Sequence, residues 1–186
     1  MALSKIDVAN MVTGAVPVAN GGTALTSGFK NGVTAASQWR LTSTFQGDAS
    51  PIASNLEEAD TDGYGTIGSS MTESSGIFTF PSTGYWFIDF RAEFYYNGDS
   101  RYTQIYIQTT TDNSSYDTAA LSTDSIAQAE SNETSAHALA SFLFDVTNTS
   151  THKVRFSLVQ SDTSGTVNGN STQNITSMTF IRLGDT

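Results

Sequence analysis

The chain of 186 residues contains no cysteine. Without thiols, neither a disulfide framework nor a thiolate metal site can form. Small secreted domains often depend on disulfides, so their absence favours a fold that assembles in a cytosol. The sequence also lacks an uninterrupted apolar run of the roughly 18 residues that a membrane-spanning helix needs. Because Asp7 and Asn10 interrupt the apolar residues near the N-terminus, we expect neither a signal peptide nor membrane insertion.

Basic residues are scarce. Eight Lys and Arg residues stand against 18 Asp and Glu residues, which gives a formal net charge of −10. Binding to nucleic acid relies on basic side chains that displace counterions from the phosphates, and this chain has no basic stripe. The sequence therefore predicts no nucleic-acid partner.

Familiar catalytic motifs are also missing. The sequence has no P-loop, no Gly-x-Gly-x-x-Gly after a strand, no His-Glu-x-x-His and no Gly-x-Ser-x-Gly elbow. Its two histidines are expected at the surface, His137 in mid-strand and His152 at a turn. We therefore expect no catalytic residues, no cofactor and no enzymatic activity.

An acidic segment around residues 57–63 allows two interpretations. Asp60 and Asp62 could supply carboxylate oxygens to Ca²⁺, which prefers such ligands. The same segment can equally be a solvated loop that ends in an Asp-Gly turn. It lacks the ligand spacing of an EF-hand, so no metal site is assigned, and Asp60 and Asp62 stand as the candidates.

Alternation of apolar and polar residues is the main pattern that the sequence does contain. Between residues 84 and 96, Trp86, Ile88, Phe90, Ala92, Phe94 and Tyr96 share one face. Such a period of two predicts a half-buried antiparallel strand. Similar strands are expected at 38–45, 64–67, 101–110, 124–130, 135–146, 153–160 and 175–183, with a polar loop at 161–174. The pattern predicts an all-β sandwich or barrel of about eight to ten strands over residues 38–186.

Residues 1–37 differ from the rest, because they are rich in small residues and contain neither Trp nor Tyr. They cannot bury enough apolar area to fold alone, so one interpretation is a disordered tail. The other is an extended arm that a neighbouring chain orders. The arm would be anchored through its apolar residues, which are Ile6, Val8, Met11, Val12, Val16 and Val18.

The second face of the long central strand is also aromatic. It carries Tyr85, Phe87 and Tyr95, which would form a large exposed patch on a monomer. Patches of several hundred Å² usually mark interfaces, and a threefold contact would cover this one. The alternative is that a second sheet, or the long loop at residues 46–75, covers it within one chain.

Loop residues on a rigid β-scaffold are the remaining candidates for recognition. Tyr96, Asn97, Tyr102 and Tyr116 could contact a glycan or a receptor, or they could be ordinary turn residues.

Several segments carry a resemblance to known proteins. The Phe-containing strand, Pro-x-x-Gly turn and Gly-Tyr-x-Phe strand at 78–87 resemble the jelly roll of complement globular heads and tumour necrosis factor ligands. Residues 142–146, 153–156 and 179–184 extend this similarity. Val-Ala-Asn-Gly-Gly-Thr at 18–23 is similar to segments of bacteriophage tail-fibre and other virion proteins, as in marine phages, although Ala24 stands where those segments usually have Gly. The resemblance implies a homotrimer whose jelly rolls pack around an axis, with the arms at one end.

These observations predict a non-enzymatic bacteriophage virion structural protein on the virion surface, assembled in the host cytoplasm. The short chain favours a trimeric capsid decoration or head-fibre protein, whose arm would bind the major capsid protein. The Asn-Gly-Gly-Thr segment favours a tail fibre, whose arm would bind a tail protein and whose knob would contact a host surface glycan. A free carbohydrate-binding jelly roll is the alternative from another class.

Overall fold

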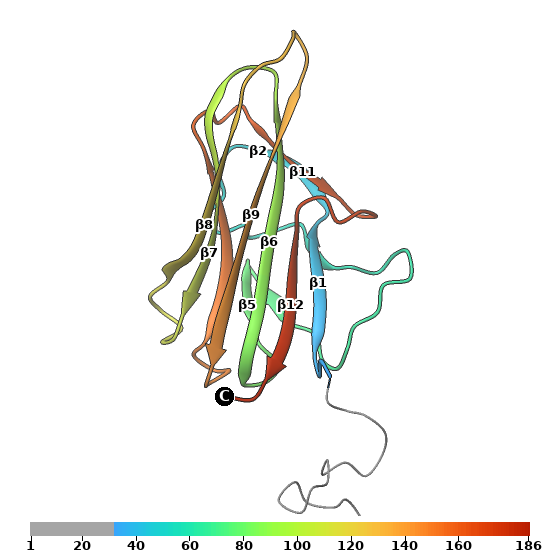
Figure 1. Ribbon diagram of the computed structural model, residues 1–186, viewed down its shortest axis with the longest axis vertical. Helices are drawn as coiled ribbons and strands as arrows, with labels where there is room; N and C mark the ends of the chain where they lie inside the picture. Colours follow the sequence, from blue (N-terminus) through green and yellow to red (C-terminus); the bar gives the residue numbers. More distant parts are fainter. Residues whose placement is uncertain (1–31) are drawn as a thin grey trace, which may run out of the picture. The chain divides into compact units, whose positions relative to one another are not determined.

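The computed structural model describes residues 32–186, and the expected anchoring residues Ile6, Val8, Met11, Val12, Val16 and Val18 lie outside them. The described residues form twelve strands and no helix (Figure 1). The strands are β1 (Ala36–Leu41), β2 (Ser43–Gln46), β3 (Leu56–Glu58), β4 (Thr72–Ser74), β5 (Ile77–Thr79), β6 (Gly84–Tyr96), β7 (Ser100–Thr110), β8 (Asp117–Ile126), β9 (Thr134–Val146), β10 (Lys153–Gln160), β11 (Thr166–Asn170) and β12 (Ser177–Gly184).

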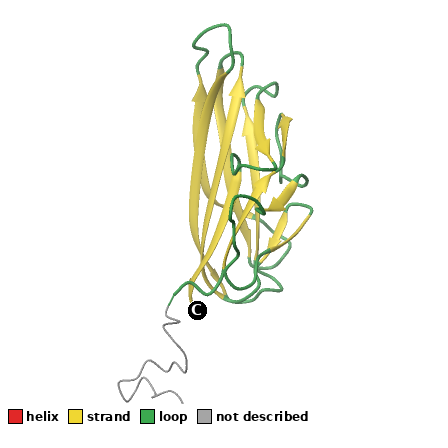
Figure 2. Cartoon of the chain, turned by 90° about the vertical axis from the view of Figure 1, so that its right-hand side faces the viewer, coloured by secondary structure: helices red, strands yellow, loops and turns green. Residues whose placement is uncertain are grey.

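The strands form two antiparallel sheets that lie face to face (Figure 2). The first sheet has the order β2-β11-β6-β12-β1-β3, and β9 runs along the other edge of β6. The second has the order β4-β5-β10-β7-β8. Most neighbours in a sheet are distant in sequence, because the chain repeatedly crosses from one sheet to the other. This arrangement confirms the predicted all-β jelly-roll sandwich.

The core between the sheets follows the predicted alternation. Trp86, Ile88, Phe90 and Phe94 of β6 are at most 1% exposed. On the opposite sheet, the side chains of Val154, Phe156 and Leu158 in β10 and of Ile105 and Ile107 in β7 are buried. Phe78 of β5 joins the two layers, with ring centroids 5.3 Å from Trp39, 5.4 Å from Phe156 and 5.2 Å from Phe180.

Several strand predictions need correction. The run expected at 38–45 is broken at Thr42, so that β1 pairs with β12 and β3 while β2 pairs with β11. No strand covers 64–67, where Ile67 makes only an isolated bridge to Ala36. The strand expected at 124–130 is β8, which ends at Ile126. The expected loop at 161–174 contains β11, whose alternation is too short to recognise because only Thr166 and Val167 are buried in it.

His152 was expected at the surface, but the residue is only 9% exposed and its ring stacks on Phe144. The last strand is central in the first sheet, because β12 lies between β6 and β1. The first strand begins at Ala36, close to the predicted start of the knob at residue 38. The arm itself stays a prediction.

The short hairpin of β4 and β5 shows how the chain makes a tight turn. Ser75 and Gly76 both have positive φ, 53° and 81°, as a two-residue type I′ turn requires. The Glu73 carboxylate accepts a hydrogen bond from the Gly76 backbone N–H. A Cβ on Gly76 would lie 2.3 Å from the backbone oxygen of Ile52, so only glycine fits there.

Candidate functional surfaces

An apolar row crosses the outer face of the first sheet, the face turned away from the second sheet. Strand register places its five residues side by side on neighbouring strands: Leu143 on β9, Phe87 on β6, Ile181 on β12, Ala36 on β1, and Ile67 bridged to Ala36. We call these five residues the apolar row. Its two ends are the most exposed, Leu143 at 53% and Ile67 at 48%. Burial of such a row against a partner would remove apolar surface from water.

Tyr85 lies next to the apolar row and is 40% exposed, and Leu183 of β12 is exposed as well. Tyr95 does not join them. Between Phe87 and Tyr95 the same face of β6 carries Asp89, Arg91 and Glu93, and the separation is about 27 Å at the usual rise of a strand. The structure thus brings together two of the three predicted interface residues, Tyr85 and Phe87, and leaves Tyr95 apart.

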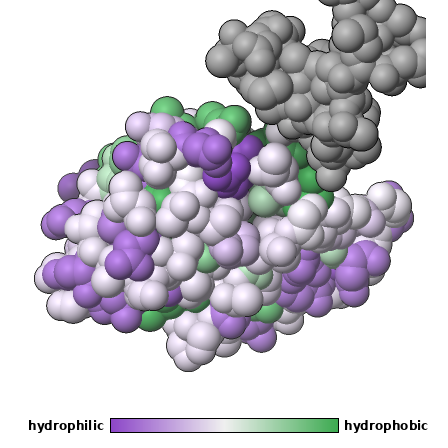
Figure 3. Space-filling model, turned by 90° about the horizontal axis from the view of Figure 1, so that it is seen from below, coloured by the Kyte–Doolittle hydropathy of each residue, from purple (hydrophilic) through white to green (hydrophobic). Residues whose placement is uncertain are grey.

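Within residues 32–186, other segments of the chain cover only one end of this face. Part of the segment at 46–75 lies against β1, where Ile67 meets Ala36. Among residues 32–186, it does not cover β6 and β9, where Leu139 and Leu143 remain 59% and 53% exposed. Viewed from below, the molecule shows separate hydrophobic patches in a largely polar surface (Figure 3).

Three of the four recognition candidates meet at the end of the sandwich where β6 turns into β7. Tyr96 ends β6, Asn97 follows it in the turn, and Tyr102 lies in β7. The Tyr96 hydroxyl donates a 2.9 Å hydrogen bond to Asp162. Acceptance of this bond by the carboxylate raises the pKa of the Tyr96 hydroxyl above its ordinary value. The Tyr96 hydroxyl is therefore already engaged within the chain.

Tyr116 lies at the other end of the sandwich, in the connection between β7 and β8. The Arg155 guanidinium sits 4.2 Å from its ring centroid, as in a cation–π contact. Burial raises the pKa of the Tyr116 hydroxyl, which has no hydrogen-bond partner among residues 32–186. Tyr116 therefore shares no surface with Tyr96, Asn97 and Tyr102.

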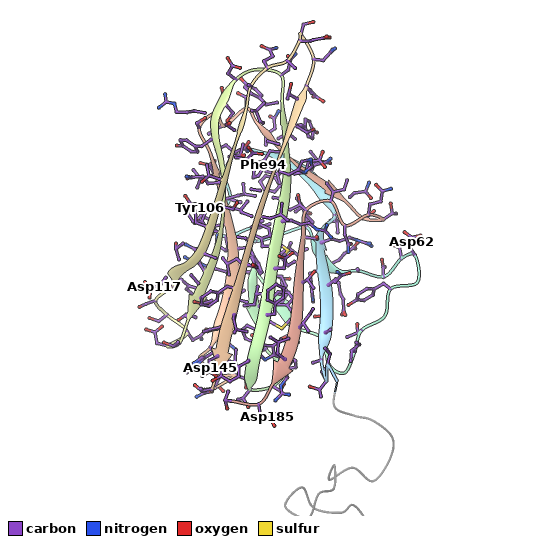
Figure 4. The ribbon with its side chains drawn as sticks, viewed as in Figure 1. Asp62, Phe94, Tyr106, Asp117, Asp145 and Asp185 are labelled. Carbon is purple, nitrogen blue, oxygen red and sulfur yellow. The ribbon has the colours of Figure 1, made fainter. Side chains whose placement is uncertain are left out.

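The two candidate metal ligands, Asp60 and Asp62, lie on one loop, but their side chains have different surroundings. Asp60 accepts a 2.6 Å hydrogen bond from Arg40. Asp62 is exposed and lies on the part of the loop that projects from the sandwich (Figure 4). Within residues 32–186, no group of three or more His, Cys, Asp or Glu side chains gathers in a metal-binding arrangement.

Arg40 was not predicted from the sequence as a site residue. It lies on β1, is 1% exposed and donates through Nε to Glu57 at 2.8 Å and through Nη1 to Thr61 at 3.0 Å, besides its bond to Asp60. A buried charge needs such partners to offset its desolvation. The sequence contains one indication of this network, which is a single arginine in an apolar strand that is followed by a cluster of acidic residues.

Of the described residues, none belongs to a helix that is long and apolar enough to cross a membrane. No known protein-family model matches the chain, and no curated protein sequence matches it either. Similar solved structures do exist. Eiger TNF from S. frugiperda matches with a TM-score of 0.60 and 10% identity, over 83% of this chain and 96% of that one.

Murine APRIL at pH 5.0 matches with a TM-score of 0.58 and 7% identity, over 80% of this chain and 98% of that one. The structure of murine APRIL at pH 8.5 matches with a TM-score of 0.55 and 8% identity, over the same fractions of the two chains. The chain folds as a tumour-necrosis-factor-like jelly roll. At such low identity, this similarity concerns the fold and not the activity.

Proposed function

We propose that the chain is a non-enzymatic structural protein of a bacteriophage virion, which forms a homotrimer and presents its jelly roll as a knob. The trimer contact would be the apolar row on the outer face of the first sheet, and this row is the observation that carries the proposal. The row crosses four strands, and Leu143 and Ile67 at its two ends are half exposed. No other described part of the chain covers the end of the row at β9. Uncovered rows of this kind are typical of interfaces.

The charge pattern on the same face supports a specific contact. Asp89 of β6 lies directly beside the row, and Arg91 and Glu93 follow farther along the same face of the strand. Arg91 donates a 2.9 Å hydrogen bond to Ser177, which fixes its position. A polar border around an apolar centre is the usual composition of an interface between subunits. A threefold arrangement would let the face of one copy meet the edge of the next and close the ring.

The virion assignment rests on the N-terminal sequence. The segment at 18–23 is similar to phage appendage proteins, and residues 1–37 would anchor the trimer. The similar solved structures support the jelly roll alone. In the preferred version, the arm binds the major capsid protein and the knob decorates the head. In the second version, favoured by the Asn-Gly-Gly-Thr segment, the arm binds a tail protein and the knob contacts the host surface.

Cryo-electron microscopy of the phage particles that encode this chain tests the proposal. Trimeric knobs at threefold or quasi-threefold positions of the capsid are the expected result. Knobs at the tail alone would replace decoration with the tail-fibre role. Particles that contain no copy of the chain, as judged by mass spectrometry, would contradict both versions.

Deletion of residues 1–31, which leaves β1 and the apolar row intact, separates a virion protein from a free carbohydrate-binding module. The truncated virion protein should remain trimeric and lose its attachment to particles lacking the native protein. The full-length chain provides the matched control. A truncated protein with undiminished function in the absence of particles would support the free module.

A further inference from the structure

A polar cleft lies beside β1, at the opposite edge of the first sheet from β9. Its volume is about 410 Å³, within the range of roughly 300–1,000 Å³ that is usual for small-ligand sites. Gln38 and Arg40 of β1 form its floor, the loop at 59–64 forms one wall, and the loop at 172–174 forms the other. Both loops project from the sandwich on the side of β1 (Figure 1).

Hydrogen bonds hold the two walls in place without a ligand. The Thr61 hydroxyl donates to the backbone oxygen of Thr172 at 3.1 Å and accepts from Arg40 at 3.0 Å. The second wall is tied to the floor, because the Asn174 amide donates to the Gln38 side-chain oxygen at 3.3 Å. A cleft that is already ordered loses little conformational entropy when it binds a ligand.

Tyr64 provides a fixed aromatic surface in this cleft. Its hydroxyl accepts a 2.9 Å hydrogen bond from the Gln38 backbone N–H and donates a 3.0 Å bond to Glu58. The side chain is half-buried, so part of the ring still faces the cleft that it lines. An aromatic ring held in one orientation offers an apolar face at little entropic cost.

Polar groups converge on the same space. The Gln173 side chain is exposed and has no hydrogen-bond partner among residues 32–186. Asn174 is half-buried, and its side-chain oxygen also has no partner among these residues. Side-chain amides both donate and accept hydrogen bonds, as sugar hydroxyls do. The cleft therefore combines amides for hydroxyl groups with a ring for the apolar C–H face of a pyranose.

Charge in and around the cleft disfavours ionic ligands. Glu57 and Asp60 are paired with Arg40, and Glu58 is engaged by Tyr64, so Asp62 is the one lining carboxylate without such a partner in the described residues. One exposed carboxylate is too few for a divalent cation. The surplus of carboxylates over Arg40 repels anionic sugars.

We infer that this cleft binds a neutral saccharide, stacked on Tyr64 and hydrogen-bonded by Gln173 and Asn174. The site differs from the predicted recognition residues Tyr96, Asn97 and Tyr102, which lie at one end of the sandwich. This site does not depend on the trimer or on the virion assignment. It gives the knob a ligand whether the protein decorates the head or forms a tail fibre.

A glycan microarray with neutral and anionic bacterial and eukaryotic glycans tests the inference on the full-length chain. We expect binding to neutral glycans only. Isothermal titration with the strongest neutral glycan should then show affinity about tenfold lower for Gln173→Ala, the change expected from the loss of one or two hydrogen bonds. Because Gln173 is exposed, this variant should fold normally, and its oligomeric state can be measured separately.

Matched controls locate the site. Gln46→Ala removes the same type of exposed side chain from β2 and should leave affinity unchanged. Tyr64→Ala should weaken binding at least as much as Gln173→Ala, while Tyr102→Ala should not. Three outcomes would overturn the inference: no neutral glycan bound, anionic glycans bound instead, or affinity lost with Tyr102→Ala and kept with Gln173→Ala.

Discussion

Arg40 of β1 is a charged residue that is almost fully buried. Its neighbours Trp39 and Leu41 face the core, so Arg40 belongs to the opposite face of β1. It lies on the outer face, but the loop at 59–64 folds over it and leaves it 1% exposed. The acidic cluster that suggested Ca²⁺ thus contains two partners of a buried guanidinium, Glu57 and Asp60.

We expect Arg40→Met to lower the free energy of unfolding by about 2 kcal/mol, because it removes the hydrogen bonds of a buried guanidinium to Glu57 and Asp60, whose carboxylates remain partly exposed to solvent. Chemical denaturation measures this change. Arg101→Met is the matched control, since Arg101 is exposed and a surface substitution typically changes stability by less than about 0.5 kcal/mol. Equal stability of the two variants would show that the Arg40 network does not stabilise the fold.

Asp112 provides a pH-dependent test at the residue scale. Hydrogen bonds from the Ser115 backbone N–H, the Thr110 hydroxyl and the Ser114 backbone N–H lower the pKa of its carboxyl to about 2. A lowered pKa stabilises the folded state above the ordinary value of 3.8, and this contribution is lost as the pH falls toward 2. NMR titration of the carboxyl carbon should therefore show a midpoint near 2.

The variant Asp112→Asn extends this test to stability. It should be less stable than the native protein at pH 7, and the difference should shrink as the pH falls from about 4 to about 2. A native carboxyl that titrates near 3.8, or a stability difference that does not change with pH, would contradict the expected role of Asp112.

At the scale of elements, β5 shows that a short strand can hold the centre of the core. It has only three residues, but Phe78 contacts three aromatic rings from both sheets. Phe78→Ala should lower the free energy of unfolding by about 4 kcal/mol through the cavity that it leaves. Ile77→Ala, on the half-buried opposite face of the same strand, should cost about 1 kcal/mol. Similar losses in thermal or chemical denaturation would contradict this account of the core.

The long elements could be predicted from the sequence because each carries its own alternation. β6 and β9 have 13 residues each, and their inward faces are buried largely as expected. β3 and β11 could not be found in this way, because their pairing partners, and not their own sequences, make them strands. The same reason explains why the cleft was missed: its floor and walls come from three segments that meet only after folding.

For the whole molecule, the apolar row also could not be read from one strand. Phe87 was predicted as an interface residue, but Leu143, Ile181 and Ile67 join it only through the register of the sheet. The predicted Tyr95 failed to join because polar residues separate it from Phe87 on β6. The proposed trimer contact is therefore a band of apolar residues across four strands, and not an aromatic stripe along one strand.

A charge within the apolar row should prevent assembly without unfolding the knob. Leu143→Lys places a charge on a side chain that is already 53% exposed, so the monomer should tolerate it. Leu121→Lys on β8, where the side chain is 49% exposed on the other sheet, is the matched control. Circular dichroism should show both variants folded, and only Leu143→Lys should lose the trimer.

The mass of the full-length chain in solution tests this account most directly. Sedimentation velocity, or light scattering coupled to size exclusion, should give three times the chain mass of 19.8 kDa for the native protein and for Leu121→Lys. Leu143→Lys should sediment at the mass of one chain. A native protein that remains at 19.8 kDa at high concentration, or a Leu143→Lys variant that still forms a trimer, would contradict the proposed contact.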